Sequence, residues 1–178
     1  MNLRYVLPMF LIVPAVAIAT ACSSAPAQVA PTALPATHKF DVHNFVGTYK
    51  GTWTNTTAGT SGPVTIAIAA DESSKTATLT IDFDGNYLGL GDPPAQTLSA
   101  KYDDSAATIK GSNPLFGDYA VSLDGDGKLN GLMKNLAAGV IPEMTYTGTV
   151  GNGRLDADYV VKFADGRVVN SILRMQRQ

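Results

Sequence analysis

The segment FVGTYKGTW, residues 45–53, alternates between two kinds of side chain. Its aromatic residues Phe45, Tyr49 and Trp53 all occupy odd positions, whereas threonine and lysine dominate the even positions. Successive side chains of a β-strand point to opposite faces, so residues two or four apart share a face. The spacing therefore predicts a strand with one aromatic face and one polar face.

The same alternation recurs through the rest of the chain, and no segment keeps the helical period of about 3.6 residues. The apolar members of these runs are Val64, Ile66 and Ile68; Leu79, Ile81 and Phe83; Leu98, Ala100 and Tyr102; Tyr119, Val121 and Leu123; Met144 and Tyr146; Leu155, Ala157, Tyr159, Val161 and Phe163; and, less regularly, Val169 to Leu173. Short segments rich in Gly, Asn and Asp separate the runs, as at 124–127 and 151–153. Such segments are typical of tight turns between antiparallel strands.

This pattern predicts an all-β protein, an antiparallel meander of about eight to ten strands closed into a soluble β-barrel. Closure is favoured because it removes the exposed edges of a long meander. Two segments break the pattern: 89–94 should be a loop, and 135–142 a loop or a helical turn that caps a barrel end. An outer-membrane barrel is the alternative, but its outward face would be apolar, whereas the more polar faces here carry threonine and charge.

The overall composition narrows the classes of partner. The chain has 178 residues, with 13 basic and 15 acidic side chains and a formal net charge of -2. That length suits a single domain, and the charge balance lacks the basic surface expected of a nucleic-acid-binding protein. Two histidines and one cysteine give no basis for a histidine-built metal site or an internal disulfide. We therefore expect no nucleic-acid partner, no metal site and no cofactor.

The N-terminal residues 1–21 have the three-part layout of a secretory signal peptide: a positive charge, an apolar stretch and small residues. Pro8 and Pro14 interrupt the apolar stretch, which argues against the alternative, a transmembrane anchor. Residues 22–38 follow as a low-complexity tether rich in Ala, Pro, Ser and Thr. The remaining residues, 39–178, form the predicted single β-barrel domain.

The end of the predicted signal, Ala19-Thr20-Ala21-Cys22, resembles the bacterial lipobox, in which the cysteine after the cleavage site is lipidated. Lipidation would also explain a lone cysteine in an exported chain. The resemblance implies a lipoprotein anchored to the cell envelope through Cys22. Ser23 after the cysteine implies the outer membrane, with the protein facing the periplasm or the cell surface. A soluble periplasmic or extracellular protein is the alternative.

Short motifs lie at both ends of the barrel domain. Residues 40–49, FDVHNFVGTY, are similar to the lipocalin opening, and Gly51-Thr52-Trp53 to its G-x-W motif. Ala157-Asp158-Tyr159 is similar to the later T-D-Y element, and Ser171-Ile172-Leu173-Arg174 to the last-strand segment whose arginine packs over the first-strand tryptophan. The domain thus resembles the lipocalin-like (calycin) superfamily. The resemblance implies a lipocalin-like barrel in which Trp53 and Arg174 form a structural, barrel-closing pair.

Large aromatic side chains fall on the faces predicted to point into the barrel. Aromatic rings with phenol tips could line a cavity for a small hydrophobic molecule. The candidate ligand-binding residues are Tyr49, Trp53, Phe83, Tyr102, Tyr119, Tyr146 and Tyr159. The alternative is that these side chains fill a small barrel completely. The protein would then be a structural or protein-interaction component of the envelope, for example an inhibitor of another protein.

No set of residues predicts an enzyme, because no nucleophile, base and orienting group can be assembled. The two histidines lie before the first strand, with no partners at a fixed spacing. The carboxylate pairs Asp82/Asp84 and Asp156/Asp158 share their faces with polar residues and fit a solvated outer surface. We therefore expect no catalytic residues and a function in noncovalent binding.

Overall fold

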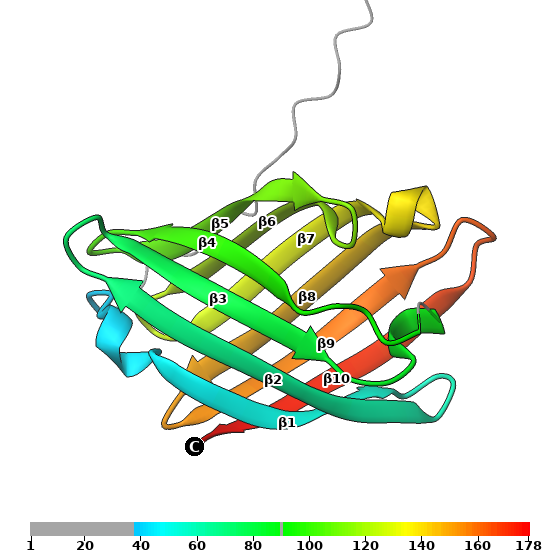
Figure 1. Cartoon of the computed structure of the whole chain (residues 1–178), viewed down its shortest axis with the longest axis horizontal. Coiled ribbons are helices and arrows are strands. Elements are labelled where there is room, and N and C mark those ends of the chain that lie inside the picture. Colours follow the sequence, from blue (N-terminus) through cyan, green and yellow to red (C-terminus); the bar gives the residue numbers. More distant parts are fainter. Residues whose placement is uncertain (1–37, 90) are drawn as a thin grey trace, which may run out of the picture.

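The computed structural model describes residues 38–89 and 91–178 (Figure 1). The predicted signal peptide 1–21, Cys22 and all but the last residue of the predicted tether 22–38 lie outside the described residues. No helix in the described part of the chain is long and apolar enough to cross a membrane.

Ten strands form one closed antiparallel barrel, in which each strand pairs with its neighbours in sequence and β1 pairs with β10. This arrangement confirms the predicted all-β fold and closed meander, at the upper end of the predicted strand number. The strands are β1 (Gly47–Asn55), β2 (Thr60–Asp71), β3 (Thr76–Phe83), β4 (Gln96–Tyr102), β5 (Ala106–Asn113), β6 (Gly117–Asp124), β7 (Lys128–Leu136), β8 (Ile141–Gly151), β9 (Arg154–Lys162) and β10 (Val168–Arg177).

Three short 3-10 helices lie at the two ends of the barrel: η1 (Val42–Asn44), η2 (Tyr87–Gly89) and η3 (Ala137–Gly139). Figure 1 shows η1, in cyan, at one end and η2 and η3, in green and yellow, at the other. We call these the η1 end, where β1 begins and β2 finishes, and the η2 end, where β1 finishes and β2 begins. The helical turn that was one of two expectations for 135–142 is confirmed as η3.

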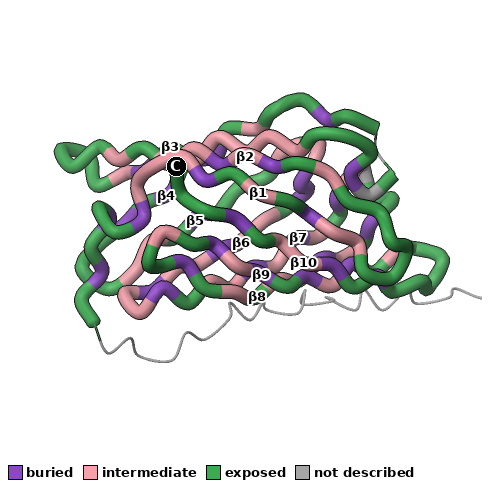
Figure 2. The backbone as a smooth tube through the Cα atoms, turned by 90° about the horizontal axis from the view of Figure 1, so that it is seen from below, coloured by how far each residue is buried: buried purple, intermediate pink, exposed green. Residues whose placement is uncertain are grey.

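The strands form because each has one apolar and one more polar face. On β9, Leu155, Ala157, Tyr159 and Val161 are buried, and the residues that alternate with them are more exposed. Figure 2 shows buried and exposed residues alternating along the barrel wall. The turn between β8 and β9 fixes their register with two residues, Asn152 and Gly153, at φ angles of 51° and 72°. Both angles are positive, as the tight hairpin turn favoured by Asn-Gly requires.

The seam between β4 and β5 is the least paired part of the barrel wall. Only three residue pairs join the two strands, from Ala100–Ile109 to Tyr102–Ala107. By contrast, nine pairs join β9 and β10. The remaining residues of both strands, 96–99 and 110–113, extend beyond this ladder towards the η2 end.

Candidate binding cavity

A cavity of about 160 Å³ lies inside the barrel. Strands β2 to β10 supply most of its lining, which consists of aliphatic, methionine and phenylalanine side chains together with Tyr87, Tyr146 and Tyr159. None of the described residues that line the cavity carries a charge. An engineered apolar cavity of about 150 Å³ in another protein stays dry and binds benzene or xenon. The cavity therefore has room for one small, compact apolar molecule.

An aromatic cluster closes the η2 end of this cavity. The ring of Tyr87 stacks on Phe83 with 4.0 Å between centroids and meets Trp53 edge-on at 5.4 Å. The Trp53 indole Nε1 donates a hydrogen bond of 3.1 Å to the Asp84 carbonyl oxygen. A Cβ atom at Gly62 would lie only 2.7 Å from that Nε1, so the indole needs a glycine beside it. The cluster is tightly packed and holds Tyr87 against the cavity.

Three hydroxyl-bearing residues form a row on the inward face of neighbouring strands. Tyr159 of β9 lies directly opposite Tyr146 of β8 and Ser171 of β10. Tyr159 and Ser171 are only 6% and 2% exposed. Neither of these two hydroxyl groups has a hydrogen-bond partner in the described structure. The Tyr159 hydroxyl lies near the hydroxyls of Ser171 and Tyr87 without a well-formed hydrogen bond to either, so its hydrogen-bonding capacity is not fully used.

The phenols of this region remain uncharged at neutral pH. Burial raises the pKa of Tyr146 and of Tyr159, and the nearby hydroxyls of Ser171 and Tyr87 only partly oppose the rise in Tyr159. Burial also raises the pKa of Tyr87 well above its usual value, and the adjacent Tyr159 adds to that rise. All three tyrosines therefore keep their protons and can donate hydrogen bonds.

A glycine makes room for the Tyr146 ring. Gly131 of β7 lies directly opposite Tyr146 in the register of β7 and β8. A Cβ atom at this glycine would overlap the phenol ring. The Tyr146 ring therefore packs against the backbone of Gly131, and Tyr146 lines the cavity from this position.

The η1 end is closed by a different aromatic group. Phe40 stacks on Phe45 with 5.1 Å between centroids, and Tyr102 packs against Phe40 at 6.1 Å. The Tyr49 hydroxyl donates a 3.1 Å hydrogen bond to the Phe45 carbonyl oxygen. The Phe40 N–H donates to the Asp104 carbonyl oxygen at 2.9 Å, which ties the segment before β1 to the turn after β4. The Tyr49 hydroxyl and the Phe40 N–H at this end are thus paired within the protein.

All seven candidate ligand-binding residues belong to the hydrophobic core or pack against it. Three of them line the cavity: Phe83, Tyr146 and Tyr159. The other four lie elsewhere in the core: Tyr49, Trp53, Tyr102 and Tyr119. The predicted inward faces are therefore observed, but the cavity touches less than half of the predicted set.

The structure does not bring together the predicted barrel-closing pair of Trp53 and Arg174. Trp53 lies opposite Leu173, and Arg174 lies opposite Thr52, so the two side chains project from opposite faces of the wall. Trp53 is 2% exposed, whereas the Arg174 side chain is 41% exposed and pairs with Asp158 at 2.7 Å. The predicted stacking is therefore wrong: Arg174 lies between the inward residues Leu173 and Met175 of β10, and this alternation places it on the outer face.

Arg177 is the arginine that meets an inward aromatic of β1. It lies directly opposite Tyr49, and it donates hydrogen bonds of 3.3 Å to the carbonyl oxygens of Asn44 and Val46. Burial raises the pKa of Tyr49, and the charge and hydrogen bonding of Arg177 oppose that rise. Arg177 thus ties the end of β10 to the segment before β1 at the η1 end.

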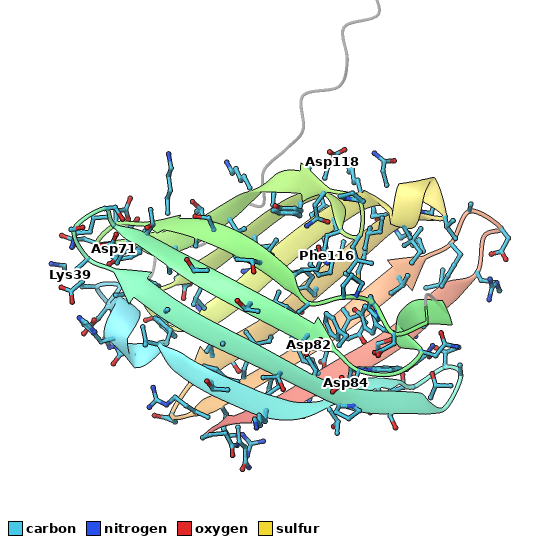
Figure 3. The ribbon with its side chains drawn as sticks, viewed as in Figure 1. Lys39, Asp71, Asp82, Asp84, Phe116 and Asp118 are labelled. Carbon is cyan, nitrogen blue, oxygen red and sulfur yellow. The ribbon has the colours of Figure 1, made fainter. Side chains whose placement is uncertain are left out.

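The remaining polar candidates lie outside the cavity. Figure 3 places Asp82 and Asp84 on β3 and the loop after it, towards the η2 end, far from Lys39 and Asp71 at the η1 end. His38, at the very start of the described chain, pairs with Asp126 at 2.5 Å on the surface. Among the described residues, no group of three or more His, Cys, Asp or Glu side chains could hold a metal ion.

Three residues that matter at the site were missed by the sequence analysis. Tyr87 lies in a segment without strand periodicity, and Phe116 lies in the turn between β5 and β6, yet both line the cavity. The sequence feature that could have identified Tyr87 and Phe116 is an isolated aromatic residue in a segment rich in Gly, Asn and Pro. Ser171 is a polar residue at an inward position, which disturbs the alternation of β10 and conceals its inward face.

No protein-family model matches this sequence, and no curated protein sequence matches it. Among solved structures, the crystal structure of Rv2717c from M. tuberculosis is similar, with a TM-score of 0.54 and 10% sequence identity. The similarity covers 77% of this chain and 94% of the other chain. At this identity the similarity shows a shared barrel fold and nothing further.

Proposed function

We propose that the barrel binds a small hydrophobic molecule noncovalently inside its cavity, and that the protein does so at the cell envelope. The observation that carries the proposal is an uncharged, almost wholly apolar cavity of about 160 Å³ within a closed barrel. Apolar cavities too large to be filled by side chains lower stability, so a retained cavity favours a binding role.

The size of the cavity limits the ligand and its affinity. Pockets for drug-sized ligands measure about 300–1,000 Å³, so this cavity suits a smaller molecule, such as a single substituted ring. Burying about 200 Å² of such a ring contributes about 5 kcal/mol. This corresponds to a dissociation constant of about 0.1–1 mM in the absence of a polar contact.

Titration of the full chain with p-xylene, followed by calorimetry, tests binding in the cavity. Ala100 is 1% exposed and lines the cavity, so Ala100→Leu places three extra carbons inside it. We expect wild type to bind p-xylene and Ala100→Leu to lose binding at least tenfold. Ser99→Leu is the matched control, because Ser99 is exposed on the outer face of the same strand. Equal binding by Ala100→Leu and wild type would contradict a site inside the barrel.

The anchoring of the protein to the envelope is part of the same proposal. It is supported by the signal-like residues 1–21 and by the lone cysteine at the lipobox-like site. The intact mass of the mature chain should start at Cys22 and include added acyl groups, and Cys22→Ser should move the protein to the soluble fraction. An unmodified Cys22 after processing would contradict the lipoprotein proposal and favour the soluble exported alternative.

We also propose a relationship to the lipocalin-like superfamily. It is supported by the closed antiparallel barrel and by the burial of Trp53, within the Gly51-Thr52-Trp53 motif, on the inward face of β1. The outward position of Arg174 argues against a close relationship. Related proteins whose sequences bridge the two motif regions would test this proposal.

One observation favours the alternative function, a filled barrel that acts through its surface as a structural or interaction protein. The cavity is smaller than the usual range for ligand pockets, so most of the interior is occupied by side chains. Native mass spectrometry of the protein purified from its own envelope separates the two. A reproducible bound small molecule supports the carrier, whereas an empty barrel with a co-purifying protein supports the alternative.

A further inference from the structure

The inward hydroxyls near the η2 end indicate the chemical class of the ligand. Tyr159 lines the cavity and its hydroxyl is buried, but that hydroxyl has no hydrogen-bond partner in the described structure. Ser171, directly opposite on β10, is buried with an unpaired hydroxyl as well. A buried donor without an acceptor is unfavourable, so a bound molecule that supplies an acceptor there gains a hydrogen bond without losing one from the protein.

The rest of the lining restricts the charge of the ligand. None of the described lining residues is charged, so a carboxylate or an ammonium group would be buried without an opposite charge. The nearest arginine on β10, Arg174, projects from the outer face and is bonded to Asp158 and the Ala157 carbonyl oxygen. Arg177 lies at the opposite, η1 end, bonded to backbone carbonyl oxygens.

The protonation state of the phenols agrees with this restriction. Burial raises the pKa of Tyr159 and of Tyr146, so both phenols are neutral at physiological pH. A neutral phenol can donate to a hydroxyl or carbonyl oxygen and can accept from a hydroxyl group.

We infer that the cavity selects compact, uncharged molecules with one hydrogen-bonding group, such as a monocyclic phenol, alcohol or ketone, and that Tyr159 binds this group with Ser171 beside it. This inference rests on the proposed function and specifies its ligand. The apolar body of the ligand lies in the middle of the barrel, and its polar atom lies towards the η2 end. Carboxylates of the same shape are rejected.

Three probes of matched shape test the inference: p-xylene without a polar group, p-cresol with a hydroxyl, and p-toluate with a carboxylate. Each is titrated into the full chain at neutral pH by calorimetry. We expect p-cresol to bind about tenfold more tightly than p-xylene, which is the effect of one neutral hydrogen bond. We expect no measurable binding of p-toluate, because its charge would be buried unpaired.

Variants assign the preference to the named hydroxyl. Tyr159→Phe should reduce p-cresol binding to the level of p-xylene and leave p-xylene binding unchanged. Tyr119→Phe is the matched control, since Tyr119 packs against the core but does not line the cavity. Thermal unfolding of each variant verifies that it is folded. Ser171→Ala, which should reduce the preference about threefold, replaces Tyr159→Phe if that variant does not fold.

The outcomes separate the inference from the proposed function. Binding of neither p-xylene nor p-cresol contradicts the proposed function itself. Equal binding of p-xylene and p-cresol, tight binding of p-toluate, or an unchanged p-cresol preference in Tyr159→Phe overturns the inference alone. If Tyr159 and Ser171 serve only each other, Tyr159→Phe lowers stability and leaves the p-cresol preference intact, which also overturns the inference.

Discussion

The two ends of the barrel close its interior in different ways. At the η1 end, the Tyr49 hydroxyl donates to a backbone carbonyl, and Arg177 binds two more carbonyl oxygens. Near the η2 end, the hydroxyls of Tyr159 and Ser171 are buried but have no hydrogen-bond partner of good geometry in the described structure. The comparison teaches that the polar groups named at the η1 end are bonded within the protein, whereas the η2 end retains unused hydrogen-bonding capacity at Tyr159, which lines the cavity, and at Ser171 beside it.

The largest expected effect concerns the packing of the η1 end. Phe45 is buried and stacks on Phe40, so Phe45→Ala should lower the free energy of unfolding by about 3–5 kcal/mol. Urea unfolding measures the loss, with Lys50→Ala on the exposed face of β1 as the control. Phe45 lines the cavity at the η1 end and carries no polar group, so the folded variant should keep its preference for p-cresol over p-xylene even if both bind more weakly. Loss of that preference would break the distinction between the two ends.

A smaller effect is expected from overfilling the η2 end. Gly62→Ala would place a Cβ atom 2.7 Å from the Trp53 indole nitrogen and 2.5 Å from the Asp84 carbonyl oxygen. We expect a loss of about 1–3 kcal/mol in stability and a changed fluorescence of the sole tryptophan. Gly151→Ala is the matched control, because a Cβ atom there meets nothing within 4 Å. Identical behaviour of the two variants would show that the indole is loosely held.

The buried phenols should make stability sensitive to high pH. An unfolded tyrosine loses its proton near pH 10, whereas burial keeps Tyr146 and Tyr159 protonated to higher pH. Above about pH 10 the folded state therefore binds more protons than the unfolded state. Stability is unaffected by these groups below that pH and falls as the pH rises above it.

The expected slope is about 1.4 kcal/mol per pH unit for each tyrosine that stays protonated only in the folded state. Urea unfolding of wild type and Tyr146→Phe between about pH 9 and 12 measures it, and the variant should lose stability less steeply. Tyr49→Phe should change the slope less, since Arg177 opposes the rise in the pKa of Tyr49. A slope for Tyr146→Phe equal to that of wild type contradicts this account of its burial.

The smallest expected effect is the difference in stability between two variants that each lose one tyrosine hydroxyl, one at each end of the barrel. Tyr49→Phe removes a hydrogen-bonded hydroxyl and should cost about 1 kcal/mol of stability. Tyr159→Phe removes an unpaired hydroxyl and should leave the stability of the ligand-free protein unchanged or slightly higher. Urea unfolding of the two variants, measured side by side, checks the difference. A larger loss for Tyr159→Phe would mean that its hydroxyl is paired within the protein.

The fold could be predicted because strand periodicity is a local property of the sequence. The odd positions of residues 45–53 and of β9 are inward as expected, and the helical turn in 135–142 lies at a barrel end. The pairing of β1 with β10 is not local, because no turn connects the two strands and nothing nearby fixes their register. Arg174 lies outside because its neighbours Leu173 and Met175 occupy the inward positions of β10, an alternation that the polar Ser171 conceals in the sequence.

The site was less predictable than the fold for two physical reasons. Tyr87 reaches the cavity from the short helix η2 and Phe116 from a turn, and in neither place does a repeating pattern indicate the direction of a side chain. Ser171 is buried although it is polar, and burial of an unpaired hydroxyl contradicts the rule from which inward faces are predicted. The predictions about export and Cys22 lie outside the described residues and stay predictions.

A crystal structure of the full chain with p-cresol tests the central claim most directly. The account predicts that the ring lies inside the barrel and that its hydroxyl oxygen is within about 2.8 Å of the Tyr159 hydroxyl oxygen. A ring bound on the outer wall, a hydroxyl directed towards the η1 end, or an empty barrel at saturating p-cresol would contradict it.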